Sequence, residues 1–197
     1  MTDNYAALMR VALVAGIPCR TPDGLKPLVH ANDPAISVMT DFTRVTPVTI
    51  EPGLSIHLAL RKMKEAGVRL LLVPDREDNI AGIITAYDIQ GERPLRLGQK
   101  QGIARADIRV QMLMTPLDKV MAMDMLTVRD ARVGHVISTM RKNECKYMLV
   151  IEMDRMSGAL VIRGLFSISN ISKLVGYDVM DVESAAHSLA EVQHTLG

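Results

Sequence analysis

Several residue types are scarce in this sequence, and each scarcity excludes a class of protein. Tryptophan is absent and aromatic residues make up only 3% of the chain, so a surface on which single-stranded nucleic acid could stack is not expected. The net charge of +1 provides no overall field to attract nucleic acid or a membrane. The longest early apolar run, residues 11–17, is too short to cross a bilayer, and no signal peptide is recognisable. We therefore expect a cytoplasmic protein that acts without membrane or nucleic acid.

Cysteines and catalytic motifs are scarce as well. Cys19 and Cys145 lie far apart and Cys145 leads an apolar strand, which favours a buried free thiol over a disulfide. The five histidines follow no metal-ligand spacing, and no GxSxG, GxGxxG or GK[ST] motif is present. An enzyme, a required cofactor and a metal site are therefore not expected. With 197 residues, 48% of them hydrophobic, the chain can bury a core as one compact domain or two small ones.

What the sequence does contain is an internal repeat. The segment 82–88, Gly-Ile-Ile-Thr-Ala-Tyr-Asp, returns 82 residues later as Gly-Leu-Phe-Ser-Ile-Ser-Asn at 164–170. Upstream, Met39-Thr40 recurs as Met114-Thr115, and the apolar run 70–73 recurs as 147–150. A duplication of this size predicts two copies of one folding unit that face each other across a pseudo-symmetric cleft.

The hydrophobic pattern predicts the same elements in both copies. Apolar residues with helical spacing form two matching stripes, at Ile56, Ala59, Leu60 and Met63 and at Val133, Val136, Ile137 and Met140. Apolar strands are expected at 68–73 and 80–84, and again at 146–152 and 159–162. A further strand at 45–50 would open the first copy, with Thr49-Ile50 matching Thr127-Val128 in the second. Helices are expected to begin at Thr85 and Ser167, so that each copy reads β-α-β-β-α.

The expected fold class is therefore α/β (α+β), with two pseudo-symmetric β-α-β-β-α repeats packed into one module. We expect an N-terminal helix (4–15) and an extended loop in residues 1–35, a first repeat at 36–91 and a second at 108–177. Between them, residues 92–107 are interpreted as a solvated linker whose basic side chains could alternatively contact phosphate. Residues 178–197 are predicted to form a C-terminal helix with one apolar face.

Several segments of the sequence resemble those of a known family. The markers Val38-Met39-Thr40 and Thr49-Ile50-Glu51-Pro52, the strand 68–73 and the segment 82–88 are similar to those of the cystathionine-β-synthase (CBS) domain. The tandem copy resembles a Bateman module, over residues 36–177.

The resemblance implies a regulatory, energy-sensing homodimer that binds AMP, ADP, ATP or S-adenosylmethionine in the cleft and signals to an unknown partner protein in trans. The alternative is a structural or dimerisation module of the same fold without a nucleotide ligand.

The resemblance assigns Asp88 to the ligand's ribose and Thr85 to ribose or phosphate. A carboxylate can accept hydrogen bonds from both ribose hydroxyls, and such charge-assisted bonds are strong. The same Thr-x-x-Asp pattern is also that of a helix capping box, in which these side chains bind only backbone groups. In the second copy the corresponding pair is Ser167 and Asn170. An amide lacks the negative charge, so we expect this second site to be weaker or empty.

Two cations occupy the same place in the two copies. Arg69 and Lys146 stand near the start of otherwise apolar strands, where the resemblance implies contact with ligand phosphates. The alternative is that each is an edge cation that discourages strand pairing. The resemblance also implies that adenine rests against Val48-Thr49 in the first copy and Leu126-Thr127 in the second.

Overall fold

A computed structural model describes residues 8–12, 15–17 and 28–180 of this chain. The predicted N-terminal helix over 4–15 is wrong for residues 8–12, which are exposed and non-helical. Ala15, where the helix was expected to end, lies in a turn, and residues 4–7 and 13–14, like Cys19, fall outside the described residues. The C-terminal helix predicted over 178–197 is wrong for residues 178–180, which are not helical, and the rest of it lies outside the described residues.

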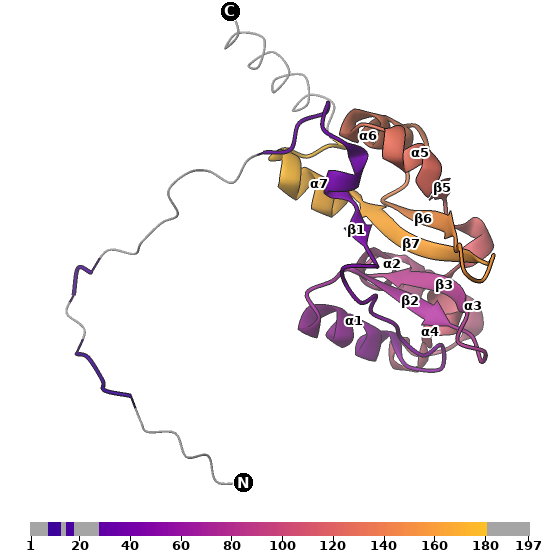
Figure 1. The fold of residues 1–197 in the computed structure, drawn as a ribbon. Coiled ribbons are helices and arrows are strands. Elements are labelled where there is room, and N and C mark those ends of the chain that lie inside the picture. The colour runs from indigo at the N-terminus through magenta and orange to yellow at the C-terminus, as the bar shows by residue number, and fades with distance from the viewer. Residues whose placement is uncertain (1–7, 13–14, 18–27, 181–197) are drawn as a thin grey trace, which may run out of the picture.

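The described residues form short helices and strands (Figure 1). The helical elements, including three 3₁₀ turns labelled η, are η1 (Ala35–Val38), α1 (Ile56–Glu65), α2 (Ala86–Gln90), α3 (Arg93–Gln101), η2 (Arg105–Asp107), α4 (Val110–Leu113), η3 (Leu117–Lys119), α5 (Met125–Asp130), α6 (Val133–Lys142) and α7 (Ile168–Val175). The strands are β1 (Thr40–Asp41), β2 (Leu70–Pro74), β3 (Ile80–Thr85), β4 (Thr115–Pro116), β5 (Ala122–Asp124), β6 (Tyr147–Met153) and β7 (Leu160–Ser167). The predicted mixed α/β class is confirmed.

The predicted stripes and hairpins are confirmed in both copies. Helices α1 and α6 occupy the two stripes, and both bury the apolar residues that define them, with Leu60 only partly buried. The backbone N–H of Leu58 donates to the side chain of Ser55 at 3.3 Å, which fixes the start of α1. The antiparallel pairs β2–β3 and β6–β7 occupy the predicted strand positions. Thr85 and Ser167 are the N-caps of α2 and α7, as expected.

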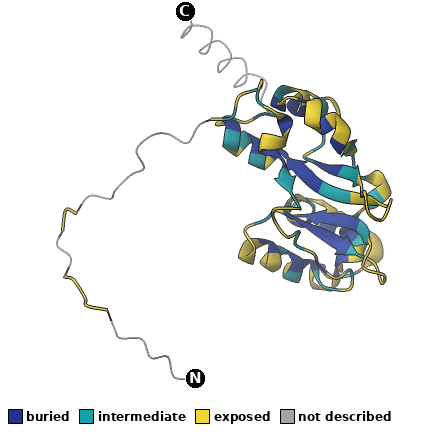
Figure 2. Ribbon diagram, viewed as in Figure 1, coloured by how far each residue is buried: buried dark blue, intermediate teal, exposed yellow. Residues whose placement is uncertain are grey.

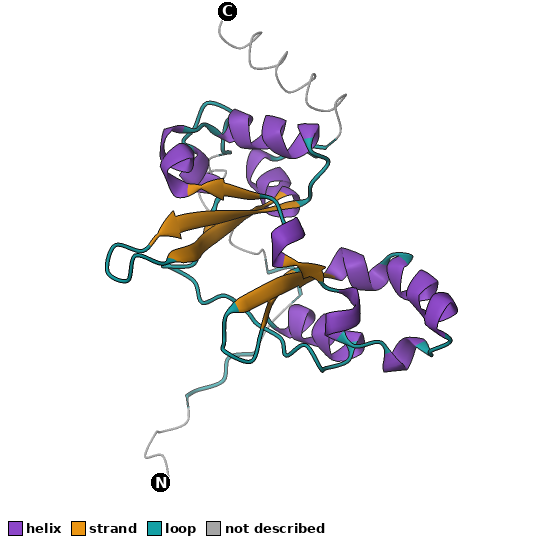
Figure 3. Cartoon of the chain, turned by 90° about the vertical axis from the view of Figure 1, so that its right-hand side faces the viewer, coloured by secondary structure: helices purple, strands orange, loops and turns teal. Residues whose placement is uncertain are grey.

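The strands form two sheets that face each other, with the helices on their outer sides (Figures 1 and 3). One sheet has the order β2-β3-β4 and the other the order β1-β7-β6-β5. A core between the sheets holds Leu70, Leu72 and Ile83 from the first copy against Leu149 and Leu165 from the second. Each sheet also has its own core against its helices. The hairpins β2–β3 and β6–β7 are therefore buried on both faces over much of their length, whereas the outer helix faces are exposed (Figure 2).

The segments that open the two copies are exchanged between them. Strand β1, from the start of the first repeat, pairs with β7 of the second, where Asp41 lies opposite Gly164. Strand β4, from the start of the second repeat, pairs with β3 of the first, where Pro116 lies opposite Gly82. The repeated Met-Thr pairs of the sequence thus mark the strands that link the two copies, and neither sheet is complete without the other copy.

This exchange explains the glycine that begins each repeated segment. A Cβ at Gly82 would lie 2.5 Å from the carbonyl oxygen of Thr115, and a Cβ at Gly164 would lie 2.4 Å from that of Thr40. Both distances are shorter than a side chain tolerates, so only glycine lets the crossing strand approach this closely.

Two predictions of local structure need correction. Residues 92–107 are not a simple solvated linker, because α3 forms there and Leu97 and Ile103 pack against the first core. The strand expected at 45–50 is reduced to one parallel bridge between Thr49 and Leu72.

The expected match of Thr127-Val128 with that strand is also wrong, because both residues lie in α5. The apolar spacing of Met125 and Val128 buries one side of this short helix, a pattern that a two-residue match could not distinguish from a strand.

Candidate functional site

A groove of about 1120 Å³ lies between the two copies. The first copy contributes the end of α1, the start of β2 and one side of α2, and the second contributes the start of β6 and α7. Equivalent positions from the two copies therefore face the same space, as the internal repeat predicts.

The groove is lined with positive charge. Arg69 and Lys146, the two cations predicted from equivalent positions, both line it, and both are exposed. Two further cations, Lys64 at the end of α1 and Lys173 on α7, also line it, against a single acidic residue, Asp178. The formal charge of the lining is 4 − 1 = +3, which favours an anionic occupant.

Two contacts cross the groove between the copies. The Lys146 ammonium lies 3.3 Å from the ring centroid of Tyr87, which belongs to α2 of the first copy, well within range of a cation–π interaction. The hydroxyl of Tyr147 donates to the backbone carbonyl of Arg69 at 3.4 Å. Burial raises the pKa of the Tyr147 hydroxyl, the Arg69 charge opposes this increase, and the Asp88 charge adds to it. Arg69, Asp88 and Tyr147 are thus close enough to interact electrostatically.

Thr85 and Asp88 form the capping box that the sequence allowed as an alternative. The Asp88 backbone N–H donates to the Thr85 hydroxyl oxygen at 3.1 Å, and the Thr85 backbone N–H donates to Asp88 Oδ2 at 3.0 Å. The Thr85 hydroxyl donates to the same Oδ2 at 2.6 Å. The other oxygen, Oδ1, accepts from Arg93 at the start of α3. Both carboxylate oxygens therefore already have protein partners.

Neither Thr85 nor Asp88 is among the residues that line the groove, although Ala86, Tyr87 and Gln90 of the same helix are. Thr85 is buried, and the Asp88 side chain is only 12% exposed. The predicted contact of Asp88 with a ribose therefore stays a prediction.

The second copy repeats the cap without the charge. Ser167 accepts from the Asn170 backbone N–H at 3.2 Å. The Asn170 side-chain amide donates to the backbone carbonyl of Val38 at 3.4 Å. The Asn170 side chain therefore ties η1, from the start of the first repeat, to α7. That the ligand site here is weaker remains a prediction.

The structure separates the two segments predicted to contact adenine. Val48 is partly buried against the first core and Thr49 is exposed beside β2. The predicted counterparts Leu126 and Thr127 are exposed on α5 and are not equivalent to them.

The backbone hydrogen bonds identify the true counterparts. Leu72 N–H donates to Val48 and Leu149 N–H donates to Met121, so Met121 and Ala122 take the places of Val48 and Thr49. Sequence matching failed because neither residue resembles its counterpart.

Several residues of the groove have no clear signal in the sequence. Lys64 and Lys173 read as ordinary polar positions of amphipathic helices, and Tyr87 falls inside the repeat at a position that holds Ser169 in the second copy. The spacing of Asp88 and Arg93 differs from the i, i+3 and i, i+4 helical pairs, so their ion pair could not be read from a helix pattern.

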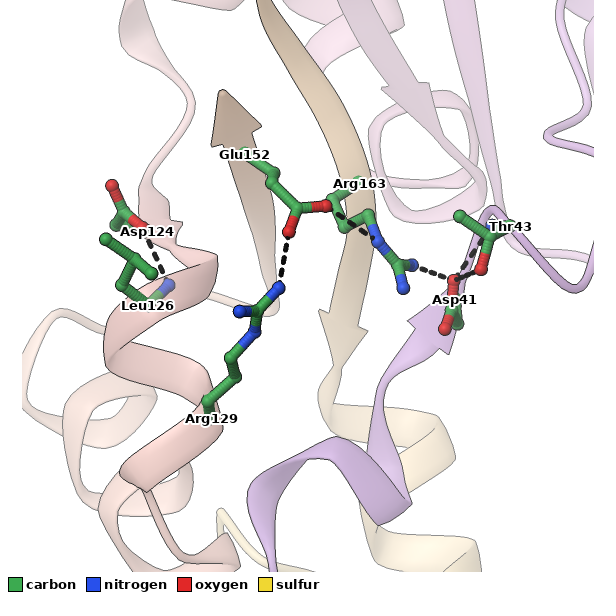
Figure 4. A network of polar contacts seen from close by, with 7 residues as sticks. All are labelled: Asp41, Thr43, Asp124, Leu126, Arg129, Glu152 and Arg163. Atoms are coloured by element: carbon green, nitrogen blue, oxygen red, sulfur yellow. Dashed lines mark hydrogen bonds and ion pairs between the residues drawn. The ribbon is translucent and has the colours of Figure 1, made fainter. Parts of the chain in front are cut away.

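A second polar network lies at the exchanged strand β1 (Figure 4). Arg163 of β7 donates to Asp41 of β1 and also contacts Glu152 of β6 at 3.0 Å, and Glu152 accepts from Arg129 at 2.7 Å. Burial raises the pKa of Asp41, but hydrogen bonds from Arg163 and Thr43 and the Arg163 charge outweigh this and hold the pKa at about 2. This network fastens the first-copy strand to the second-copy sheet and lies apart from the groove lining.

Two further findings concern the described residues only. They include no group of three or more His, Cys, Asp and Glu side chains arranged to hold a metal ion. No helix in this part of the chain combines the length and apolar character needed to cross a membrane.

One segment of the chain matches the model of a known family. Residues 35–93 match the family model of the CBS domain. No curated protein matches the chain. Among solved structures, an uncharacterized conserved protein from Pyrococcus horikoshii is 23% identical with a TM-score of 0.51, and the match covers 74% of this chain and 93% of that one. This likeness supports the fold.

Two further solved structures carry the family in their descriptions. The CBS-domain containing protein ATU1752 from Agrobacterium tumefaciens is 20% identical with a TM-score of 0.47, over 70% of this chain and 93% of that one. The CBS domain pair of protein MJ0100, in complex with 5′-methylthioadenosine and S-adenosyl-L-methionine, is 20% identical with a TM-score of 0.47, over 76% and 98%.

Proposed function

We propose that this chain, in which residues 35–93 match the CBS-domain family model, is a regulatory module with two copies of the repeat that binds an adenine nucleotide in the groove between them. The observation that carries the proposal is the pair Arg69 and Lys146, which equivalent positions of the two copies direct to one shared groove. A phosphate chain is an occupant that both cations can bind through charge-assisted hydrogen bonds.

The charge of the groove narrows the ligand class. The lining has a formal charge of +3, which attracts AMP, ADP and ATP and disfavours S-adenosylmethionine, whose sulfonium is a cation. The nucleoside would extend from the groove toward Thr85 and Asp88 at the start of α2, and its ribose hydroxyls would compete with Arg93 for Asp88.

Signalling follows from the position of the groove. A ligand that touches both copies favours one relative tilt of the two sheets over another, by no more than its difference in affinity for the two arrangements. This change in tilt would be transmitted to the second subunit of a homodimer and to a separate partner protein.

One observation favours a second function, that of a structural or dimerisation module without nucleotide. Both oxygens of Asp88 are already engaged by Thr85 and Arg93, as a purely capping role requires.

Calorimetric titration of the protein with AMP, ADP, ATP and S-adenosylmethionine separates these functions. We expect the nucleotides to bind, and Arg69→Met and Lys146→Met each to weaken ATP binding by roughly 10- to 150-fold, because a hydrogen bond to a charged group contributes about 1.5–3 kcal/mol. Lys119→Met, an exposed cation on η3 outside the groove lining, is the matched control and should bind like the wild type. Absence of binding by every nucleotide would leave only the structural function.

A further inference from the structure

The two groove cations are not in equivalent surroundings. Lys146 is the only described cation that lies over an aromatic ring, that of Tyr87. The position in the second copy that corresponds to Tyr87 is Ser169, which also lines the groove. Arg69 therefore has no ring of this kind opposite it, and the duplication has become asymmetric where the two cations meet the groove.

From this asymmetry we infer that Tyr87 makes the groove sensitive to the number of phosphates in its ligand. Lys146 stays on the Tyr87 ring until a longer phosphate chain draws it away. The inference rests on the proposed function and specifies its ligand. Arg69 is available to a single phosphate group. Lys146 binds a phosphate only after it leaves the Tyr87 ring.

The energetics favour this exchange for a polyphosphate. An exposed cation–π contact such as this one, with Tyr87 62% exposed, stabilises the pair modestly, whereas a charge-assisted hydrogen bond to a phosphate oxygen is stronger. On this inference a monophosphate binds Arg69 alone and leaves the ring contact in place. A di- or triphosphate engages both cations and releases Tyr87.

The geometry links this release to the first copy. Tyr87 belongs to α2, directly between the cap residues Thr85 and Asp88, and Lys146 directly precedes β6 of the second-copy sheet. The contact is therefore a bond between the two copies. A ligand that breaks it changes how the copies are held together, which a monophosphate does not do.

The test compares Tyr87→Leu, which removes the ring, with Tyr87→Phe, which keeps it. In calorimetric titrations of the full chain we expect Tyr87→Leu to bind ATP about two- to fivefold tighter than the wild type, since the ring contact no longer has to be broken. AMP binding should be unchanged, and Tyr87→Phe should match the wild type for both nucleotides. Equal changes for AMP and ATP, or Tyr87→Phe behaving like Tyr87→Leu, would overturn the inference.

A second measurement does not depend on the nucleoside. In NMR spectra, the ring current of Tyr87 should shift the Lys146 ε-methylene protons upfield, and Tyr87→Leu should abolish the shift. Inorganic tripolyphosphate should move this signal to its position in Tyr87→Leu, and orthophosphate should leave it in place. A signal that is unshifted at the outset, or insensitive to tripolyphosphate, would overturn the inference. If tripolyphosphate moves the signal while no nucleotide binds, the adenosine assignment fails and the charge-sensing contact stands.

Discussion

At the scale of single residues, the same side chain can serve the fold and the ligand. Asp88 caps α2 through Thr85 and pairs with Arg93, so its carboxylate is held in one orientation before any ligand arrives. A fixed acceptor loses little freedom on binding. The capping role and the proposed ribose role are therefore compatible, provided that one oxygen accepts a further hydrogen bond.

Asp88→Ala tests both roles. We expect nucleotide affinity to fall about 10- to 150-fold, because a charged acceptor is lost, and the free energy of unfolding to fall by about 1 kcal/mol with the cap. Calorimetric titration and urea unfolding measure the two effects. Asn170→Ala should weaken binding much less. Equal effects of the two substitutions on affinity would mean that the two sites are ranked wrongly.

The pH dependence of stability tests Asp41. Its folded pKa of about 2 lies below the ordinary value of 3.8, so the carboxylate is stabilised by folding. This contribution is complete above about pH 4 and is lost as the pH falls through about 2. Asp41→Asn should lower the free energy of unfolding by about 1–2 kcal/mol at pH 7. Urea unfolding should show the difference from wild type shrinking between pH 4 and pH 2, and a constant difference would contradict the assigned role.

At the scale of elements, the repeated glycines let the exchanged strands of one copy pack closely against the other copy. Gly82→Ala and Gly164→Ala should each lower the free energy of unfolding by about 1–3 kcal/mol, because the added Cβ would collide with the carbonyl of Thr115 or Thr40. Gly53→Ala is the matched control, since a Cβ there meets nothing within 4 Å, and its stability should stay within about 1 kcal/mol of wild type. Denaturant unfolding of the three variants measures this, and similar losses in all three would refute the steric explanation.

These elements also show what the sequence could predict. Helix α1 and the hairpin β2–β3 follow from local periodicity and turn residues, which act within a few positions. The two-residue strands β1 and β4 do not, because their pairing depends on β7 and β3, more than 30 residues away in the chain.

The residues of the candidate site likewise divide into those that the sequence predicts and those that it does not. Arg69 and Lys146 were predicted because the duplication aligned them, and the structure places both in the groove, although their phosphate role stays a prediction. Leu126 and Thr127 were misplaced because the second copy diverges over 121–123. Tyr87 was missed as a groove residue because its contact with Lys146 joins the two copies, and a repeat pattern within each copy does not predict a contact between them.

At the scale of the whole molecule, the two copies share a core and exchange strands, so neither has an independent set of contacts. The inter-sheet core contains Leu70 and Leu72 beside Leu149, and each sheet includes an edge strand from the other copy. Ligand in the groove adds a further contact to both copies. These features predict that the two copies unfold together.

Hydrogen exchange measured by mass spectrometry tests this cooperativity. We expect Gly82→Ala, a change in the first copy, to lower the protection of β6 and β7 in the second copy by the same free energy as that of β2 and β3, about 1–3 kcal/mol. Because a ligand that binds only the folded state stabilises everything that unfolds with it, saturating ATP should raise the protection of both sheets equally. If β6 and β7 kept wild-type protection in Gly82→Ala, the copies would be separate folding units, and a ligand bound to one could not alter the other through the shared core.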